Sequence, residues 1–260
     1  IEDGETAEQA ALREVTEELG TKPQGHVSLL MRHTLTGVDY STFIAHVAEK
    51  FEPTISEELT DWIWAAPNNP PDPLHPGVRL ALDRLRMNEL DIARAIASGE
   101  FSSPQQYENI WLFAIRITGT GVSYRQELNE YVWREPSIYL TSEFIQRCYG
   151  LPVIIEHPPG EELDTKEFAN RVIGTIVLPY IEHDEVWGIA RIYDQGAAAM
   201  MTKYRLSTSP AVVFRDPGVN RTKKLEGGKH LLIEGDPSLL DHIAIVEAGV
   251  WDKGGDPTGV

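Results

Sequence analysis

The first twenty residues hold the feature that most constrains the fold, a helix that is apolar on one face and acidic on the other. One apolar stripe is predicted from residues four apart: Ala7, Ala11, Val15 and Leu19. Thr6 followed by Gln9 is the start of a capping box. Gly20 stands where a residue in the left-handed conformation would end the helix.

Three carboxylates share the other face of this helix. They are spaced i, i+3 and i+4: Glu14, Glu17 and Glu18. Like charges this close together destabilise a helix unless a cation lies among them. Carboxylate oxygens suit hard divalent cations, above all Mg²⁺. The spacing therefore predicts a metal site on this face, the alternative being a solvated acidic surface.

The same stretch resembles the Nudix box, the signature of hydrolases that cut nucleoside diphosphates linked to another moiety. The pattern is Glu, seven residues, then Arg-Glu-Val-x-Glu-Glu-x-Gly. It matches at Glu5, Arg13, Glu14, Val15, Glu17, Glu18 and Gly20. Two positions depart from it. The leading glycine of the box would fall just before residue 1, and the apolar position after Gly20 is Thr21.

The resemblance implies an α/β/α sandwich over residues 1–90, incomplete at its N-terminus, that hydrolyses a nucleoside diphosphate derivative with Mg²⁺ or Mn²⁺. The implied metal ligands are Glu14, Glu17 and Glu18, and Glu17 is also implied in catalysis. The implied structural and orienting residues are Glu5, Arg13 and Gly20.

The rest of this first region alternates like a half-buried sheet. The predicted strands are His26–Leu35, Thr42–Ala48 and Trp62–Trp64. Glu57 or Glu58 is a secondary candidate for positioning metal or water, the alternative being an exposed charged turn. His75-Pro76-Gly77 predicts the start of an amphipathic helix, and the domain boundary is expected between residues 87 and 105.

Composition excludes several classes of protein. A net charge of −17 argues against direct nucleic-acid binding. No run of 18 apolar residues is present, so no membrane association is expected. A single cysteine, Cys148, excludes an internal disulfide framework and is typical of a reducing compartment. A His-based zinc site has no supporting ligand spacing.

Residues 105–250 predict a second, β-rich α+β domain, followed by a loose tail at 251–260 that is rich in glycine and proline. The predicted strands are Ile110–Thr118, Leu151–Glu156, Ile173–Leu178, Val186–Tyr193, Arg205–Phe214, Lys229–Glu234 and Ile243–Val246. The predicted helices are Thr141–Cys148, Lys166–Asn170 and Ala197–Lys203.

Polar residues at strand ends mark a second candidate site. His157 follows one apolar strand, His242 opens another, and Ser207 and Ser209 lie in a third. A serine is a poor nucleophile unless a base accepts its proton and a third group orients that base. These residues supply such parts, although most histidines in a domain of this size are structural.

The second domain resembles the phage prohead maturation protease superfamily, which shares its fold with the herpesvirus assembly protease. Val153–His157 matches the strand that ends in histidine, and His242–Val246 matches the last strand. Ser209-Pro-Ala-Val aligns with Ser-x-Gly-aromatic, with alanine for glycine, whereas Ser207 matches less well downstream. Both serines stay open at this point.

This second resemblance implies a β-barrel domain with flanking helices and a serine protease that needs no cofactor. Ser209 or Ser207 would attack, His157 would be the base, and His242 would orient it. The implied partners are phage scaffold and capsid proteins, in the host cytoplasm and inside the procapsid.

Three hypotheses follow for the whole chain. The first is a bifunctional phage morphogenesis enzyme, an Mg²⁺-dependent Nudix hydrolase joined to a prohead protease. The second is a Nudix hydrolase whose partner domain is catalytically inert and mediates assembly. The third is a structural phage protein in which the Nudix region is a degenerate binding module.

Overall fold

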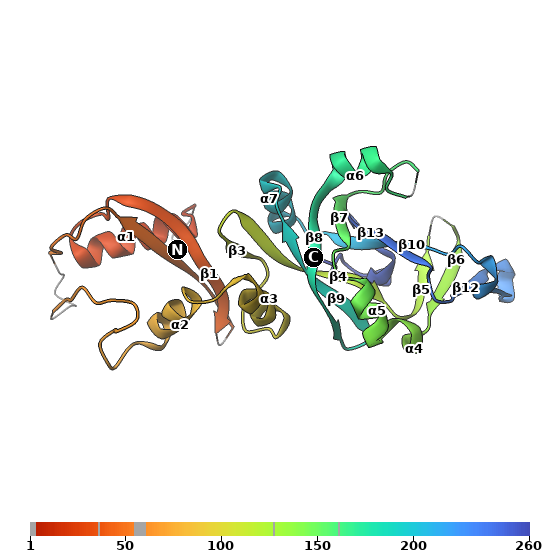
Figure 1. Ribbon diagram of the computed structural model, residues 1–260, viewed down its shortest axis with the longest axis horizontal. Coiled ribbons are helices and arrows are strands. Elements are labelled where there is room, and N and C mark those ends of the chain that lie inside the picture. The colour runs from red at the N-terminus through yellow and green to blue at the C-terminus, as the bar shows by residue number, and fades with distance from the viewer. Residues whose placement is uncertain (1–3, 36, 55–60, 127, 161) are drawn as a thin grey trace. The chain divides into compact units, whose positions relative to one another are not determined.

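The computed structural model describes residues 4–35, 37–54, 61–126, 128–160 and 162–260 (Figure 1). The chain divides into two compact units, residues 1–92 with 100–102 and residues 93–99 with 103–260. Helix α3, Glu89–Ala97, contains the point at which the first unit gives way to the second. Among the described residues, no helix combines the length and the apolar character needed to span a membrane.

The first unit is built on an antiparallel pair of strands, β1 (Gly25–Leu35) and β2 (Val38–Val47). Two helices accompany this pair, α1 (Ala7–Leu19) and α2 (Pro76–Arg84). The predicted helix start at His75 is confirmed, because its Nδ1 accepts a hydrogen bond from the amide of Gly77 at 3.1 Å.

The strand predicted at Trp62–Trp64 is wrong, because these residues are not in a strand. Local hydrogen bonds engage the segment instead. The Asp61 carboxylate accepts from the Trp62 amide at 2.8 Å, and the Trp64 indole donates to the Phe51 carbonyl at 3.0 Å. The bond to Asp61 takes up a backbone donor that a sheet ladder would use. Among its described residues, the first unit therefore shows a two-stranded sheet rather than the full sandwich that was expected.

The second unit is organised around a seven-stranded sheet with the order β10-β13-β7-β8-β9-β4-β3. Its strands are β3 (Gln105–Tyr107), β4 (Ile110–Gly119), β7 (Pro152–Ile155), β8 (Val172–Glu182), β9 (Glu185–Ile192), β10 (Ser207–Val213) and β13 (Leu239–Val246). The strands predicted in the second unit are all present, but four were missed: β3 in this sheet, and β5, β6 and β11 in the smaller sheet described next. Strand β13 runs antiparallel to β10 and parallel to β7.

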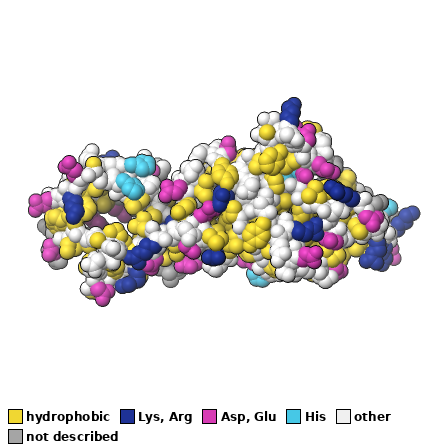
Figure 2. All heavy atoms as spheres, viewed as in Figure 1, with side chains coloured by type: hydrophobic (Ala, Val, Ile, Leu, Met, Phe, Trp, Pro, Cys, Tyr) yellow, Lys and Arg dark blue, Asp and Glu magenta, His cyan; other side chains and the backbone are white. Residues whose placement is uncertain are grey.

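A four-stranded sheet with the order β11-β12-β6-β5 completes the unit. Its strands are β5 (Gly121–Arg125), β6 (Glu130–Arg134), β11 (Arg221–Lys224) and β12 (His230–Glu234). Every residue of β11 is exposed, and Figure 2 shows Lys and Arg side chains gathered at the end of this unit near β12. Positive charge on an edge strand discourages pairing with another chain.

Helices lie at the margins of these sheets. They are α4 (Pro136–Tyr139), α5 (Ser142–Arg147), α6 (Thr165–Arg171), α7 (Gln195–Lys203) and the 3-10 turns η1 (Pro217–Val219), η2 (Glu226–Gly228) and η3 (Val250–Asp252). The apolar core includes Phe113 of β4, Tyr139 of α4, Phe144 of α5 and Met201 of α7. The core therefore joins the seven-stranded sheet to three of these helices.

The seven-stranded sheet does not close into the expected barrel, since β10 and β3 stand at the two ends of its order. The chain near residue 259 lies between β10 and β4. The carbonyl of Gly259 accepts from the Arg116 amide of β4 at 2.9 Å, and a Cβ on Gly259 would collide with Thr208 of β10. The Thr208 hydroxyl of β10 also donates to the Arg116 carbonyl of β4 at 2.6 Å, so tail and side-chain contacts, and not a strand ladder, join β10 to β4.

The tail at 251–260 was expected to be loose, and it packs against the second unit instead. Trp251 is 3% exposed. The Thr258 amide donates to Asp252 at 3.2 Å, and Val260 packs against the core. Apolar and hydrogen-bonded anchors outweigh the glycine- and proline-rich composition that predicted disorder.

Candidate active sites

Helix α1 presents the acidic face with both of its ends fixed. Thr6 Oγ1 accepts from the Gln9 amide at 3.2 Å, and Gln9 Oε1 accepts from the Thr6 amide at 2.9 Å, so the predicted capping box is confirmed. Gly20 ends the helix with φ 64°, and a Cβ there would collide with the Thr54 carbonyl. Glycine is therefore required at this position both for its conformation and for the close approach.

Replacing Thr6 with Ala should loosen the start of α1, because the Gln9 amide loses its acceptor, the Thr6 hydroxyl. Loss of an N-cap typically costs about 1 kcal/mol. Hydrogen exchange on the full chain should show faster exchange in the first turn of α1. A Glu8→Gln variant, which leaves the capping box intact, serves as the control, and equal protection in both variants would contradict the role of Thr6.

Arg13 connects the carboxylates of the box. Its guanidinium contacts Glu5 at 3.1 Å, Glu17 at 3.3 Å and Glu14 at 3.4 Å. The Glu5 side chain is 15% exposed, whereas those of Glu14 and Glu17 are 62% and 63% exposed. Glu5 and Arg13 thus form the inner part of the cluster, and two carboxylates of the predicted metal face extend into solvent beside them.

The donor chemistry of this face fits a magnesium ion, although the side chains do not form a closed cage. Among the described residues, no three acidic, histidine or cysteine side chains gather closely enough to hold a metal. Mg²⁺ keeps several of its waters and is commonly bound through one or two carboxylates. The exposed Glu14, Glu17 and Glu18 meet that requirement. Glu57 and Glu58 lie outside the described residues.

In the second unit the structure brings two of the predicted residues together. Strand β7 delivers His157 just beyond its end, and β13 carries His242. The His157 Nδ1 and His242 Nε2 atoms are 2.8 Å apart. His157 is exposed and His242 is fully buried, so the pair runs from the surface into the sheet.

Ser209 lies on the same face of the sheet as His242. Across the β10–β13 ladder, Ser209 is opposite Ala244 and Ala211 is opposite His242. Paired residues and residues two apart share a face, so Ser209 and His242 are diagonal neighbours. Ser209 is half-buried and makes no side-chain hydrogen bond within the described part of the chain.

Ser207 has a structural role. Its side chain is fully buried, its hydroxyl donates to Asp252 at 2.8 Å, and the Arg116 guanidinium donates to it at 3.3 Å. Burial alone would raise the pKa of Asp252, but hydrogen bonds from Gly249, Ser207 and Arg116 lower it below its ordinary value. An ionised carboxylate therefore holds the Ser207 hydroxyl, and Ser209 is left as the candidate nucleophile.

Asp241 is a site residue that the sequence analysis missed. Its Oδ2 lies 2.7 Å from Nδ1 of His242, and it also accepts from the Leu163 amide at 2.9 Å. The signal was present, because an acidic residue directly precedes the candidate histidine. It was overlooked because neighbouring residues in a regular strand point to opposite faces.

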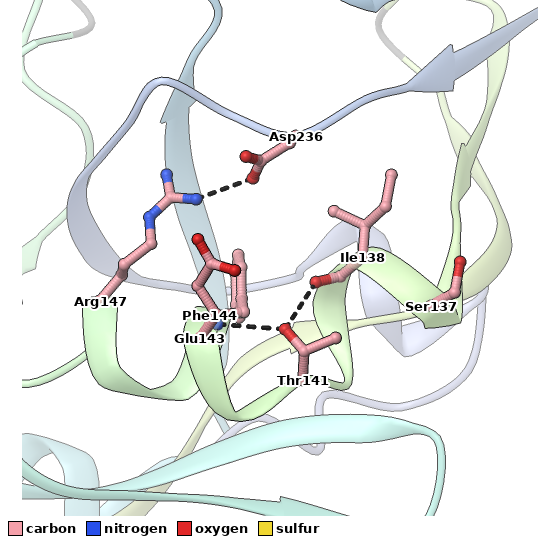
Figure 3. A pocket seen from close by; sticks show the side chains of 7 residues that line it. All are labelled: Ser137, Ile138, Thr141, Glu143, Phe144, Arg147 and Asp236. Carbon is pink, nitrogen blue, oxygen red and sulfur yellow. Dashed lines mark hydrogen bonds and ion pairs between the residues drawn. The ribbon is translucent and has the colours of Figure 1, made fainter.

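A pocket and the buried Cys148 are two further features of this unit, and neither forms a catalytic arrangement among the described residues. A pocket of about 220 Å³ lies between α4, α5 and Asp236 (Figure 3). Three of its polar side chains are already engaged, since Arg147 pairs with Asp236 at 2.7 Å and Thr141 caps α5. Burial raises the pKa of the Cys148 thiol to about 12, which keeps it protonated and inert.

Comparison with known proteins assigns the first unit alone. Residues 1–85 match the family model of the NUDIX domain, which identifies this part of the chain with a family of hydrolases. No curated protein matches the chain. No solved structure matches it either.

Proposed function

Because residues 1–85 match the Nudix domain, we propose that this part of the chain hydrolyses a nucleoside diphosphate linked to another moiety, with Mg²⁺ or Mn²⁺ as cofactor. The observation that carries the proposal is the pairing of Arg13 with Glu5, Glu14 and Glu17. That pairing joins residues at four positions of the family pattern into one cluster on α1.

The residues divide the work between orientation and metal binding. Glu5, the least exposed carboxylate of the cluster, holds Arg13, and Arg13 orients Glu14 and Glu17. Glu14, Glu17 and Glu18 would hold the metal. A bound divalent cation polarises a phosphoryl oxygen and lowers the pKa of a water molecule. The exposure of these carboxylates gives a phosphate-bearing substrate access to the face.

Replacing Glu17 with Gln should lower the rate of hydrolysis on the order of 100-fold, because one anionic oxygen ligand is lost while the side chain keeps its shape. The measurement is phosphate or nucleotide release from a panel of nucleoside diphosphate conjugates, with Mg²⁺ titrated. Glu8→Gln, on the exposed first turn of the same helix, is the matched control and should retain the wild-type rate.

An equal rate in the Glu17 and Glu8 variants would remove the metal role of the acidic face. Absence of hydrolysis by the wild-type chain over the whole panel would leave the first unit as a binding module.

A second candidate function is serine-type acyl transfer in the second unit, and the contact between His157 and His242 favours it. The Ser209 oxygen would attack a carbonyl carbon, and its proton would pass to Nε2 of His157. The leaving amine would take that proton as the carbon–nitrogen bond breaks. Water would then hydrolyse the acyl ester in the same way and regenerate the serine.

Labelling with a fluorophosphonate tests this second function without a known substrate. The probe should form one covalent adduct, and peptide mass spectrometry should locate it on Ser209 rather than Ser207. Labelling should disappear in Ser209→Ala. An adduct on Ser207, or none on the folded wild-type chain, would remove the assignment.

The partners proposed for this activity are phage scaffold and capsid proteins, with the host cytoplasm and the procapsid interior as the location. The support is the resemblance around His157, Ser209 and His242. The competing proposals are an inert assembly domain behind an active Nudix unit, and a chain with no enzymatic function.

A further inference from the structure

A β-bulge in β13 lies directly beside the histidine pair. Ala211 of β10 is opposite His242, and the next residue, Val212, is opposite Leu240, so Asp241 is an extra residue with no partner of its own. In a regular strand, Asp241 and His242 would point to opposite faces. A bulge sets two residues against one and redirects a side chain. The bulge thus explains how the Asp241 carboxylate reaches the ring of the residue next to it.

The carboxylate of Asp241 is fixed in place. Its Oδ2 atom faces two donors, the Leu163 amide at 2.9 Å and Nδ1 of His242 at 2.7 Å. The Asp241 side chain is 11% exposed, and the His242 side chain is fully buried. A shielded oxygen held by a backbone amide gives the imidazole an acceptor in one defined position.

We propose that Asp241 is a positioning residue that sets the tautomer of the His242–His157 pair; the proposal rests on the acyl-transfer function of this site. The Oδ2 atom of Asp241 accepts from the Leu163 amide and is an acceptor toward the ring as well, so Nδ1 of His242 carries a proton. In the neutral ring, Nε2 of His242 is then an acceptor, and Nδ1 of His157 donates to it. The remaining nitrogen of His157, Nε2, carries a lone pair.

This proton order has a direct chemical consequence. A lone pair on Nε2 allows His157 to take the proton of Ser209, whereas the opposite tautomer would put a proton there and leave no base. After the transfer, the positive charge on His157 faces His242, which in turn donates to the Asp241 carboxylate. Asp241 acts through His242 and does not itself contact the reacting atoms.

Nitrogen-15 NMR of the histidine rings in the full chain tests the tautomers independently of activity. At a pH where both rings are neutral, His157 and His242 should each carry the proton on Nδ1. In Asp241→Ala, the His242 signals should shift toward the Nε2-protonated form. Asp241→Asn keeps an acceptor oxygen and should retain the wild-type tautomer.

Acylation by p-nitrophenyl acetate provides the kinetic readout. Asp241→Ala should lower the acylation rate about 10–100-fold, the usual effect of losing a partner that orients a functional histidine. Asp241→Asn should recover most of that loss. Asp236→Ala, which removes an exposed carboxylate paired with Arg147, is the control and should leave both readouts unchanged.

A proton on Nε2 of His242 in the wild-type chain, or the same tautomer in the wild type and Asp241→Ala, would overturn the proposal. One further result would distinguish the role of Asp241 from the acyl-transfer function on which the proposal rests. The expected tautomers without any acylation would support the role of Asp241 in setting the proton order and would remove acyl transfer as the function of the site.

Discussion

His157→Ala is expected to reduce acylation of Ser209 about 10²–10⁴-fold, the usual contribution of a positioned general base. The variant removes the ring that contacts Nε2 of His242, and it leaves His242 and Asp241 in contact. Since His157 is exposed, its removal opens no cavity in the core. The loss should therefore appear mainly in the rate of acylation, with a cost in stability of about 1–3 kcal/mol because Nε2 of the buried His242 loses its partner.

The measurement is the rate of fluorophosphonate labelling at Ser209 and the burst phase with p-nitrophenyl acetate. His183→Ala is the matched control, because His183 is another exposed histidine of the second unit, in the turn between β8 and β9. Adding imidazole should restore part of the lost rate in His157→Ala if the missing group is a base. Equal rates in the two variants would show that His157 takes no part in the chemistry.

Most of the structural features that could be predicted from the sequence depend on local patterns. The capping box at Thr6 and the left-handed Gly20 depend on neighbours within a few residues, and both are confirmed. The long strands of the second unit were also predicted, because runs such as Ile110–Thr118, which lies within β4, are apolar enough to be buried. The resemblance to the Nudix box also came from short-range spacing, and the family model matches residues 1–85.

The missed elements depend on contacts between distant parts of the chain. Strand β6 is short and pairs in parallel with β12, which lies about a hundred residues further on. Pairing across such a separation leaves little trace in local periodicity. The packing of the tail around Trp251 and Gly259 was not predicted for the same reason. Apart from Asp252, the residues that hold the tail in place belong to strands that are distant in the sequence.

In the second candidate site, too, local patterns indicate individual residues but not the contacts between them. Histidines at strand ends could be identified from the sequence. Their contact could not be predicted, because it depends on the pairing of β7 with β13. Asp241 was invisible to strand periodicity, because its orientation comes from a bulge. The family pattern favoured Ser209 over Ser207 by its alignment alone, and the structure adds a physical reason, the buried contacts that hold Ser207.

Glu234→Gln is expected to destabilise the second unit by about 3–5 kcal/mol, the usual cost of breaking a buried ion pair. Glu234 of β12 contacts Arg134 of β6 at 2.6 Å and also pairs with Arg125 of β5. The side chains of Glu234 and Arg134 are each 2% exposed. Without the carboxylate, Arg134 remains a buried charge between the rings of Tyr139 and Trp251, at 5.3 and 5.1 Å.

The same carboxylate makes the stability depend on pH. Burial would raise the pKa of Glu234, but the guanidinium groups of Arg134 and Arg125 lower it below its ordinary value. A depressed pKa contributes stability that is complete above the pKa of the unfolded chain and is lost as pH falls through that of the folded chain. Below the ordinary range of glutamate, the wild type should lose stability more steeply with falling pH than Glu234→Gln.

Urea unfolding of the full chain, followed by circular dichroism and by hydrogen exchange in β6 and β12, measures both effects. Asp256→Asn is the control, because the Asp256–Arg205 pair is about four-fifths exposed and should contribute within about 1 kcal/mol. Adding Arg134→Met to Glu234→Gln should recover part of the loss, since no uncompensated charge then remains at that position. Additive losses in the double variant would mean that Arg134 and Glu234 stabilise the sheet independently, and not as a pair.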